Sequence, residues 1–153
     1  MHVPTSESTG TSYKFQRKDG LESSVHVAVD CVDRGTSTVI LILHGLNGGS
    51  DEEYVKDMAR NSKSSVCVMI GRGLMGTPVT DGGMFNGARV VDVGVVAGAI
   101  KETVGGGCKV VAVGYSMGGI VLANYVSRAG GEVKVDGAVI VGGGIWMMAN
   151  KVR

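Results

Sequence analysis

One short segment places a serine between two glycines at a spacing that could expose its hydroxyl as a nucleophile. Residues 114–118 read G-Y-S-M-G, directly after an apolar run and directly before a helical pattern. In a nucleophile elbow the serine occupies a sharp strand-to-helix turn, where nearby glycines let strand and helix pass closely. Ser116 is therefore the predicted nucleophile, with Gly114 and Gly118 making room for the turn. A glycine-rich turn without chemistry is the alternative, because the chain has 26 glycines.

A second segment could supply the hydrogen-bond donors that such a nucleophile needs. Acyl transfer to a serine builds negative charge on the carbonyl oxygen, and backbone N–H groups in an oxyanion hole stabilise that charge. In elbow folds these groups come from the residue after the nucleophile and from the loop after another strand. Met117 and Leu46 are the predicted donors, and Asn47 is a further candidate beside Leu46.

His44 and Gly45 begin that loop, at the end of an apolar run over residues 38–43. The imidazole of His44 could take part in catalysis, or it could hold the loop by hydrogen bonds. The second role is favoured, because His44 precedes Ser116 and the histidine of an elbow enzyme follows its serine along the chain. We therefore assign His44 and Gly45 to support of the loop.

A third glycine-rich segment offers a different chemistry. Residues 71–76 read G-R-G-L-M-G, which matches the G-x-G-x-x-G pattern of dinucleotide-binding loops. Such a loop must open a helix whose N-terminus holds the pyrophosphate. Here Pro78, Gly82 and Gly83 follow and would break a helix. A nucleotide-binding module is the less favoured alternative, and saturation binding of a fluorescent dinucleotide would test it.

Strands and helices alternate along the chain in an order that would position these segments. Runs of β-branched and aliphatic residues predict strands covered on both faces, and amphipathic stretches predict helices between them. The strands are expected at residues 38–43, 65–70, 110–113 and 138–141, and the helices around 54–59, 88–99 and 120–129. Ser50 and Glu53 are the expected capping box of the first helix. Right-handed crossovers then give a mostly parallel sheet with helices on both faces.

An antiparallel hairpin is expected before this region. Residues 13–15 and 25–31 alternate apolar and polar side chains, and Asp19 and Gly20 lie between them. Residues 1–12 are polar and rich in serine and threonine, so they are expected to form a flexible tail. The fold class is thus α/β, in a single domain over residues 13–153.

Composition and charge exclude several classes of partner. Fifteen Lys and Arg residues balance 14 Asp and Glu residues, for a net charge of +1, so neither nucleic acid nor an anionic membrane is expected as a partner. The uncharged run at residues 137–149 is shorter than the roughly 18 residues of a membrane span. No signal peptide begins the chain, which leaves the cytoplasm as the default expectation.

The three cysteines, Cys31, Cys67 and Cys108, are far apart and form no C-x-x-C pair. Buried, reduced thiols are predicted rather than a disulfide or a metal site. His2, His26 and Cys31 have no ligand spacing of a familiar kind. We expect neither a metal nor a cofactor.

Taken together, the glycine-rich segments resemble the AB hydrolase superfamily, and within it the AB hydrolase 4 branch of YheT-like and embryogenesis-associated esterases. The matching patterns are H-G-L-N-G-G-S at residues 44–50, R-G at 72–73 and G-Y-S-M-G-G at 114–119. The resemblance runs from about residue 13 to residue 144. One departure is Gly71, where such proteins often carry asparagine.

This resemblance implies the α/β-hydrolase fold and a serine hydrolase of the carboxylesterase or acylglycerol lipase class. Ser116 would be the nucleophile, and Leu46 and Met117 would supply the oxyanion N–H groups. The implied substrates are carboxylic esters, with short-chain esters and acylglycerols as the substrate class.

The acid and histidine that complete such a triad follow the serine along the chain. All three histidines precede Ser116, and the acids after it are Glu132 and Asp136. Asp136 introduces the very next strand, which is too early for a triad acid. We therefore expect the N-terminal half of a hydrolase, truncated after about the sixth strand and inactive without a C-terminal half. The alternative is an incompetent fragment or a non-enzymatic interaction piece.

Overall fold

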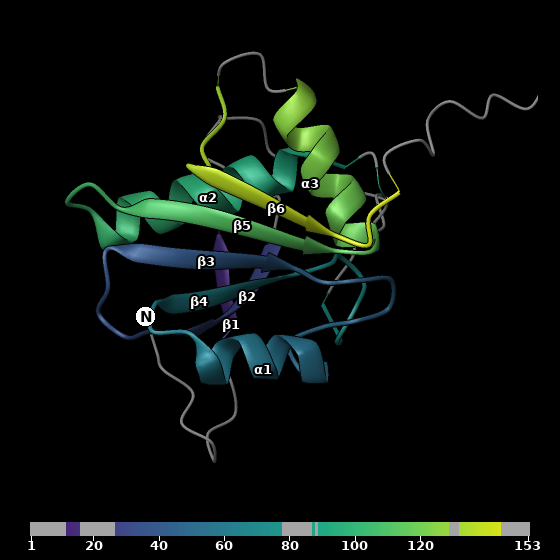
Figure 1. Ribbon diagram of the computed structural model, residues 1–153, viewed down its shortest axis with the longest axis horizontal. Coiled ribbons are helices and arrows are strands. Elements are labelled where there is room, and N and C mark those ends of the chain that lie inside the picture. Colours follow the sequence, from purple (N-terminus) through teal and green to yellow (C-terminus); the bar gives the residue numbers. More distant parts are fainter. Residues whose placement is uncertain (1–11, 16–26, 78–86, 88, 129–131, 145–153) are drawn as a thin grey trace, which may run out of the picture.

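A mixed sheet with helices on both faces forms the body of the protein (Figure 1). The computed structural model describes residues 12–15, 27–77, 87, 89–128 and 132–144. The strands in these residues are β1 (Ser12–Phe15), β2 (Val27–Val32), β3 (Thr38–Leu43), β4 (Ser65–Ile70), β5 (Lys109–Tyr115) and β6 (Gly137–Val141). The helices are α1 (Glu53–Asn61), α2 (Val91–Val104) and α3 (Met117–Arg128).

The strands lie in the order β1-β2-β4-β3-β5-β6. The last four of these pair in parallel, whereas β1 pairs antiparallel with β2 and β2 antiparallel with β4. The predicted mostly parallel sheet with an N-terminal antiparallel hairpin is therefore confirmed, and the described residues contain six of its strands. The expected turn at Asp19 and Gly20 and nearly all of the expected tail at residues 1–12 lie outside the described residues.

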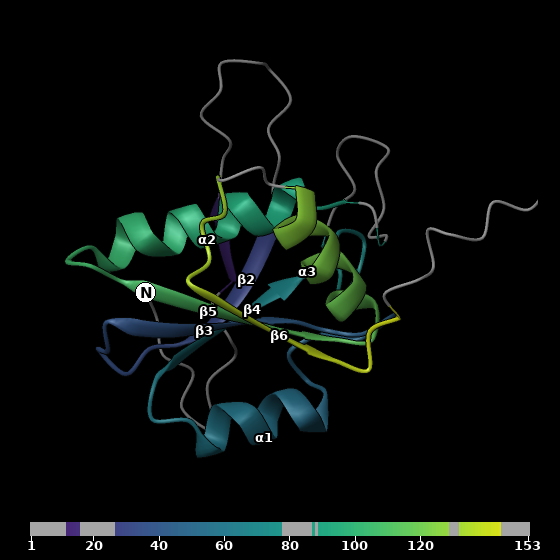
Figure 2. The ribbon, with the colours of Figure 1, turned by 45° about the horizontal axis from the view of Figure 1, so that its top comes forward.

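Helices cover the two faces of the sheet unequally: α1 lies on one face, and α2 and α3 lie on the other (Figure 2). Because side chains alternate along a strand, β3 contributes to both layers. Leu41 and Leu43 belong to the larger core under α2 and α3, while Ile42 packs with Val55 of α1, and all three β3 side chains are fully buried. This two-sided cover explains why β3 reads as a continuous apolar run.

The first helix begins at Glu53, without the N-terminal cap that the sequence predicts. Its N-cap is Glu52, which makes no side-chain capping bond, so the expected capping box of Ser50 and Glu53 is wrong. Ser50 Oγ donates instead to the carboxylate of Asp30 on β2. A hydrogen bond between distant parts of the chain thus replaces the local one that the sequence pattern favoured.

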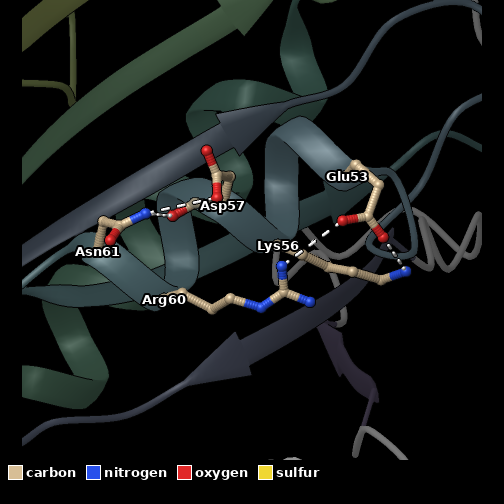
Figure 3. A network of polar contacts seen from close by, with 5 residues as sticks. All are labelled: Glu53, Lys56, Asp57, Arg60 and Asn61. Carbon is tan, nitrogen blue, oxygen red and sulfur yellow. Dashed lines mark hydrogen bonds and ion pairs between the residues drawn. The ribbon is translucent and has the colours of Figure 1, made fainter.

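A polar network covers the solvent side of α1 (Figure 3). Glu53 accepts hydrogen bonds from Lys56 Nζ at 3.2 Å and from Arg60 Nη1 at 3.5 Å, and Asn61 Nδ2 donates to the carbonyl of Asp57 at 2.9 Å. The Lys56 ammonium is the main reason why the pKa of Glu53 is lowered. These pairs are exposed and contribute little to stability, so α1 is held mainly through its buried side.

The second helix turns a different face to the core from the expected one. Ala88, Val91, Val95 and Ala99 are spaced three and four apart in the sequence, which predicts that they share the buried face, yet Val91 is exposed and Val95 is half-buried. The fully buried side chains are Val93, Val96, Ala97 and Ile100. Apolar residues surround most of this helix, so their spacing alone does not determine which face is buried.

Two of the three cysteines are bonded to each other. Cys31 and Cys67 are directly opposite in the antiparallel pairing of β2 with β4, with Cα atoms 4.2 Å apart, and they form a disulfide. The prediction of reduced thiols is therefore wrong for this pair. Cys108 is a buried free thiol whose pKa is raised by burial. The pairing of β2 with β4, which the sequence did not indicate, is what brings the first two together.

One edge of the sheet exposes apolar side chains. In β6, Val139, Ile140 and Val141 are 49%, 39% and 44% exposed. Among the described residues β6 pairs with β5 alone, and α3 contacts it from one face. No described helix has the length and apolar character needed to cross a membrane.

Candidate active site

Ser116 stands at the corner between β5 and α3, where its side chain is exposed. Its φ is 50°, a left-handed conformation that is uncommon for a residue with a side chain. Two backbone bonds hold it there: its N–H donates to the carbonyl of Val141 at 2.9 Å, and its own carbonyl accepts the N–H of Ile120 at 3.1 Å. The backbone is therefore fixed in a strained turn that presents the hydroxyl outward.

The glycines on either side of this serine are required by close backbone approach. A Cβ on Gly114 would lie 2.5 Å from the carbonyl oxygen of Gly118. A Cβ on Gly118 would overlap the carbonyl of Leu43 at the end of β3. Strand β5 and helix α3 thus pass as closely as the G-x-S-x-G pattern predicts. The first turn of α3 also packs directly against the end of β3.

His44 follows β3 and is buried, with 1% of its surface exposed. Its Nε2 accepts the N–H of Gly71 at 2.9 Å, so its Nδ1 carries the proton and donates to the carbonyl of Gly45 at 2.7 Å. Burial is the main cause of its lowered pKa, which keeps the ring neutral. The ring joins the loops after β3 and β4, as a supporting residue would.

The loop after His44 forms a tight turn next to the serine. Gly48 N–H donates to the carbonyl of Gly45 at 3.2 Å, and Asn47 has a φ of 55°. Leu46, at the tip of the turn, is 62% exposed. A Cβ on Gly45 would lie 3.6 Å from the Cβ of Ser116, so the structure brings the predicted oxyanion loop to the predicted nucleophile.

A cavity of about 400 Å³ opens beside Ser116. It is lined by Gly45, Leu46, Gly48, Glu52, Tyr54, Tyr115, Ser116 and Val141. Sequence reasoning missed the two tyrosines, whose rings contact each other with centroids 4.5 Å apart. Burial, followed by the neighbouring Tyr54, raises the pKa of Tyr115. The position of Tyr115 directly before the predicted nucleophile was the signal that could have identified it.

A sequence model of the family described as alpha/beta hydrolase fold matches residues 38–152. The chain belongs to this family. It is 34% identical over 110 residues to the embryogenesis-associated protein EMB8 of Picea glauca, covering 67% of this chain and 23% of that one. It is 26% identical over 107 residues to a monoacylglycerol lipase of Saccharomyces cerevisiae, covering 67% and 24%.

Solved structures of hydrolases share the fold. An esterase of Pyrococcus furiosus, Pf2001, superposes with a TM-score of 0.69 at 15% identity, covering 92% of this chain and 51% of its own. A putative aryl esterase of Burkholderia cenocepacia superposes with a TM-score of 0.56 at 26% identity, covering 88% and 47%. The chain spans between 23% and 35% of the length of the curated relatives that it matches.

The loop after β4 contributes a buried ion pair. Arg72 Nε and Nη2 donate to the two carboxylate oxygens of Asp92 at 2.8 and 2.6 Å. Asp92 lies in the first turn of α2, where the helix dipole also favours its negative charge. Residues 71–77 form turns, so within these described residues the glycine-rich loop does not open a helix.

Asp136 lies at the end of the sheet opposite to Ser116. It precedes β6, which runs parallel to β5, whereas Ser116 follows the carboxyl end of β5. Its carboxylate contacts Lys101 Nζ at 2.8 Å and accepts the N–H of Val110 at 2.8 Å, and the Lys101 contact is the main cause of its lowered pKa. The topology therefore keeps this acid away from Ser116. Within the described residues, no three His, Cys, Asp or Glu side chains gather to hold a metal ion.

Proposed function

We propose that Ser116 is the nucleophile of a serine hydrolase that cleaves carboxylic esters, with Leu46 and Met117 supplying the oxyanion N–H groups. The observation that carries this proposal is the strained, outward-facing serine beside the turn at residues 45–48. A left-handed serine needs support from its surroundings, and such strain concentrates at functional sites. Two close glycine contacts provide that support here.

The chemistry would proceed through an acyl-enzyme. Ser116 Oγ attacks the ester carbonyl carbon while a base takes its proton, and the carbonyl oxygen becomes negative. Backbone N–H groups at Leu46 and Met117 would stabilise that oxygen. The C–O bond to the alcohol then breaks, the alcohol leaves with the proton, and water releases the acid from the serine by the same steps.

The cavity supports small esters or acylglycerols as substrates. Its volume of about 400 Å³ is within the usual range of small-molecule sites. Leu46 and Val141 provide apolar walls, and Tyr54 and Glu52 provide polar groups at the same opening. The relatives named above include a monoacylglycerol lipase and a putative aryl esterase, which fits an ester substrate.

We also propose that the acid and the histidine of the triad come from a C-terminal half outside this sequence. His44 is buried and engaged in the loop, and Asp136 lies at the far end of the sheet. An unassisted serine hydroxyl is a weak nucleophile at neutral pH. The chain alone is therefore expected to react slowly, with its oxyanion groups in place.

Labelling with a fluorophosphonate tests this function, with and without added imidazole as an external base. Ser116 Oγ would form a bond to phosphorus, fluoride would leave, and imidazole would take the proton. We expect slow labelling that imidazole accelerates and that Ser116→Ala abolishes, while Ser127→Ala, at an exposed serine on α3, labels normally. Labelling that persists in Ser116→Ala, or no labelling of the folded chain even with imidazole, would overturn the proposal.

A further inference from the structure

Tyr54 connects the oxyanion loop to the nucleophile corner. It comes from α1, and its hydroxyl oxygen accepts the N–H of Gly45 at 3.0 Å. Its ring packs against Tyr115, the residue directly before Ser116, with an angle of 46° between the ring planes. One half-buried side chain thus contacts both segments that a hydrolase must hold in register.

The hydroxyl of Tyr54 is placed against both ends of the turn at residues 45–48. A Cβ on Gly45 would lie 3.7 Å from it, and a Cβ on Gly48 would lie 3.3 Å from it. A side chain at Gly48 would therefore press on the hydroxyl, whereas a Cβ at Gly45 would make only an ordinary van der Waals contact with it. The absence of a side chain at Gly48 leaves room for the Tyr54 hydroxyl beside the backbone of the loop.

The backbone of Gly45 is engaged on both sides. Its N–H is bonded to Tyr54, and its carbonyl accepts from His44 Nδ1 at 2.7 Å and from the N–H of Gly48 at 3.2 Å. The N–H of Gly45 is thus directed to the tyrosine and not to a substrate. An oxyanion donor from this loop must come after Gly45, which favours Leu46.

We infer that Tyr54 is a positioning residue for ester hydrolysis: its hydroxyl fixes Gly45 so that the next N–H in the loop faces the oxyanion. This inference rests on the proposed function of Ser116 and adds a specific residue to it. A tyrosine that serves only to pack α1 against the sheet would need its ring but not its hydroxyl. The two roles are therefore separable by removing the oxygen atom alone.

Tyr54→Phe removes that oxygen and keeps the ring contact with Tyr115. Tyr125→Phe is the matched control, because the Tyr125 hydroxyl also accepts a backbone N–H, that of Lys134 at 2.9 Å, on α3 away from the cavity. We expect Tyr54→Phe to slow imidazole-assisted fluorophosphonate labelling about tenfold, since small misplacements of reacting groups cost this much or more. Tyr125→Phe should label at the rate of the unmodified protein.

Amide hydrogen exchange provides a readout that does not depend on labelling. Tyr54→Phe should accelerate exchange at Gly45 and Leu46 while β3 amides stay protected, whereas Tyr125→Phe should leave both loop amides unchanged. The inference is overturned if Tyr54→Phe labels at the unmodified rate, if both variants slow labelling equally, or if loop exchange does not change. A further outcome is that Tyr54→Phe accelerates amide exchange in the loop while the unmodified protein is never labelled by the fluorophosphonate. The proposed function then fails, and Tyr54 has a structural role only, which also overturns its role in hydrolysis.

Discussion

Strands β3 and β6 are built from the same kinds of residue but have opposite surroundings. The sequences are TVILIL and GAVIV. Leu41 and Ile42 of β3 are fully buried, since β4 and β5 flank this strand and helices cover both faces. Val139 of β6 is 49% exposed, with β5 as the partner strand in the described residues. An apolar run therefore shows that a strand can be covered on both faces, while the neighbouring elements decide whether it is.

The candidate site lies between these two regions. On the β3 side, the loop at residues 44–48 is held by buried hydrogen bonds and contacts the nucleophile corner. On the β6 side, the carbonyl of Val141 accepts the Ser116 N–H, and the same exposed residue borders the cavity. The well-packed side fixes Ser116 and the loop at residues 44–48, and the exposed side is where we propose that the other two members of the triad approach.

The largest effect is expected where the elbow meets the end of β3. Gly118→Val should destabilise the protein by about 3 kcal/mol or more, because its Cβ would overlap the carbonyl of Leu43. Gly137→Val in β6 is the control, since a Cβ there would meet only Val111 methyl groups at 3.7 and 3.8 Å. Urea unfolding measures both. Equal stabilities for the two variants would show that the close passage at the elbow is not present.

A matched pair of truncations compares the two strands directly. Ile42→Ala should cost about 2–5 kcal/mol, because Ile42 is fully buried against α1. Ile140→Ala should cost about 1 kcal/mol or less, because 39% of this side chain is already exposed. Chemical denaturation of both variants gives the difference. If the two costs are the same, β6 is covered in solution, for example by self-association.

Local patterns predicted the strands and the elbow because each depends on neighbours in sequence. Residues 38–43 and 65–70 were predicted with the bounds that β3 and β4 have, since fully covered strands need continuous apolar runs. The G-x-S-x-G pattern indicated the turn at Ser116 because only glycine fits the close contacts there. Where chain-local chemistry dictates the geometry, the sequence was sufficient.

The features that the sequence did not reveal depend on contacts between distant segments. The disulfide of Cys31 with Cys67 follows from the register of β2 on β4, which no local pattern encodes. Ser50 bonds to Asp30 instead of capping α1, for the same reason. Tyr54 lies in the stretch at residues 54–59 that predicts a helix, and its bond to Gly45 depends on how α1 packs against the sheet, which no local pattern encodes.

The buried end of β3 also predicts a pH dependence. Burial lowers the pKa of His44 below its usual 6.5, although its bond to Gly45 and the acids Glu52 and Asp51 act in the opposite direction. The unfolded chain then binds a proton at His44 more readily than the folded chain does. The contribution of neutral His44 to the free energy of unfolding is therefore complete above about pH 6.5. It is lost as the pH falls from there through the folded pKa.

Unfolding free energies measured between pH 7.5 and pH 5 should therefore decrease more steeply for the unmodified protein than for His44→Gln. The difference between the two slopes isolates His44 from the other two histidines, which are present in both proteins. Parallel slopes would mean that the imidazole takes up its proton as easily when folded as when unfolded, and that the end of β3 is not closed to water.

The smallest effect on stability, and the sharpest test of the β6 surface, is expected for Val139→Lys. Half of this side chain is exposed, so the free energy of unfolding should change by less than about 1 kcal/mol. An exposed apolar edge strand favours association between chains, and a lysine on it opposes this. Sedimentation velocity should show less self-association than in the unmodified protein. Val126→Lys, at a 40% exposed position on α3, adds the same charge away from the edge. If both variants reduce self-association equally, the net charge of the protein controls it and the exposed β6 edge does not. The difference in exposure between β3 and β6 would then have no effect on association in solution.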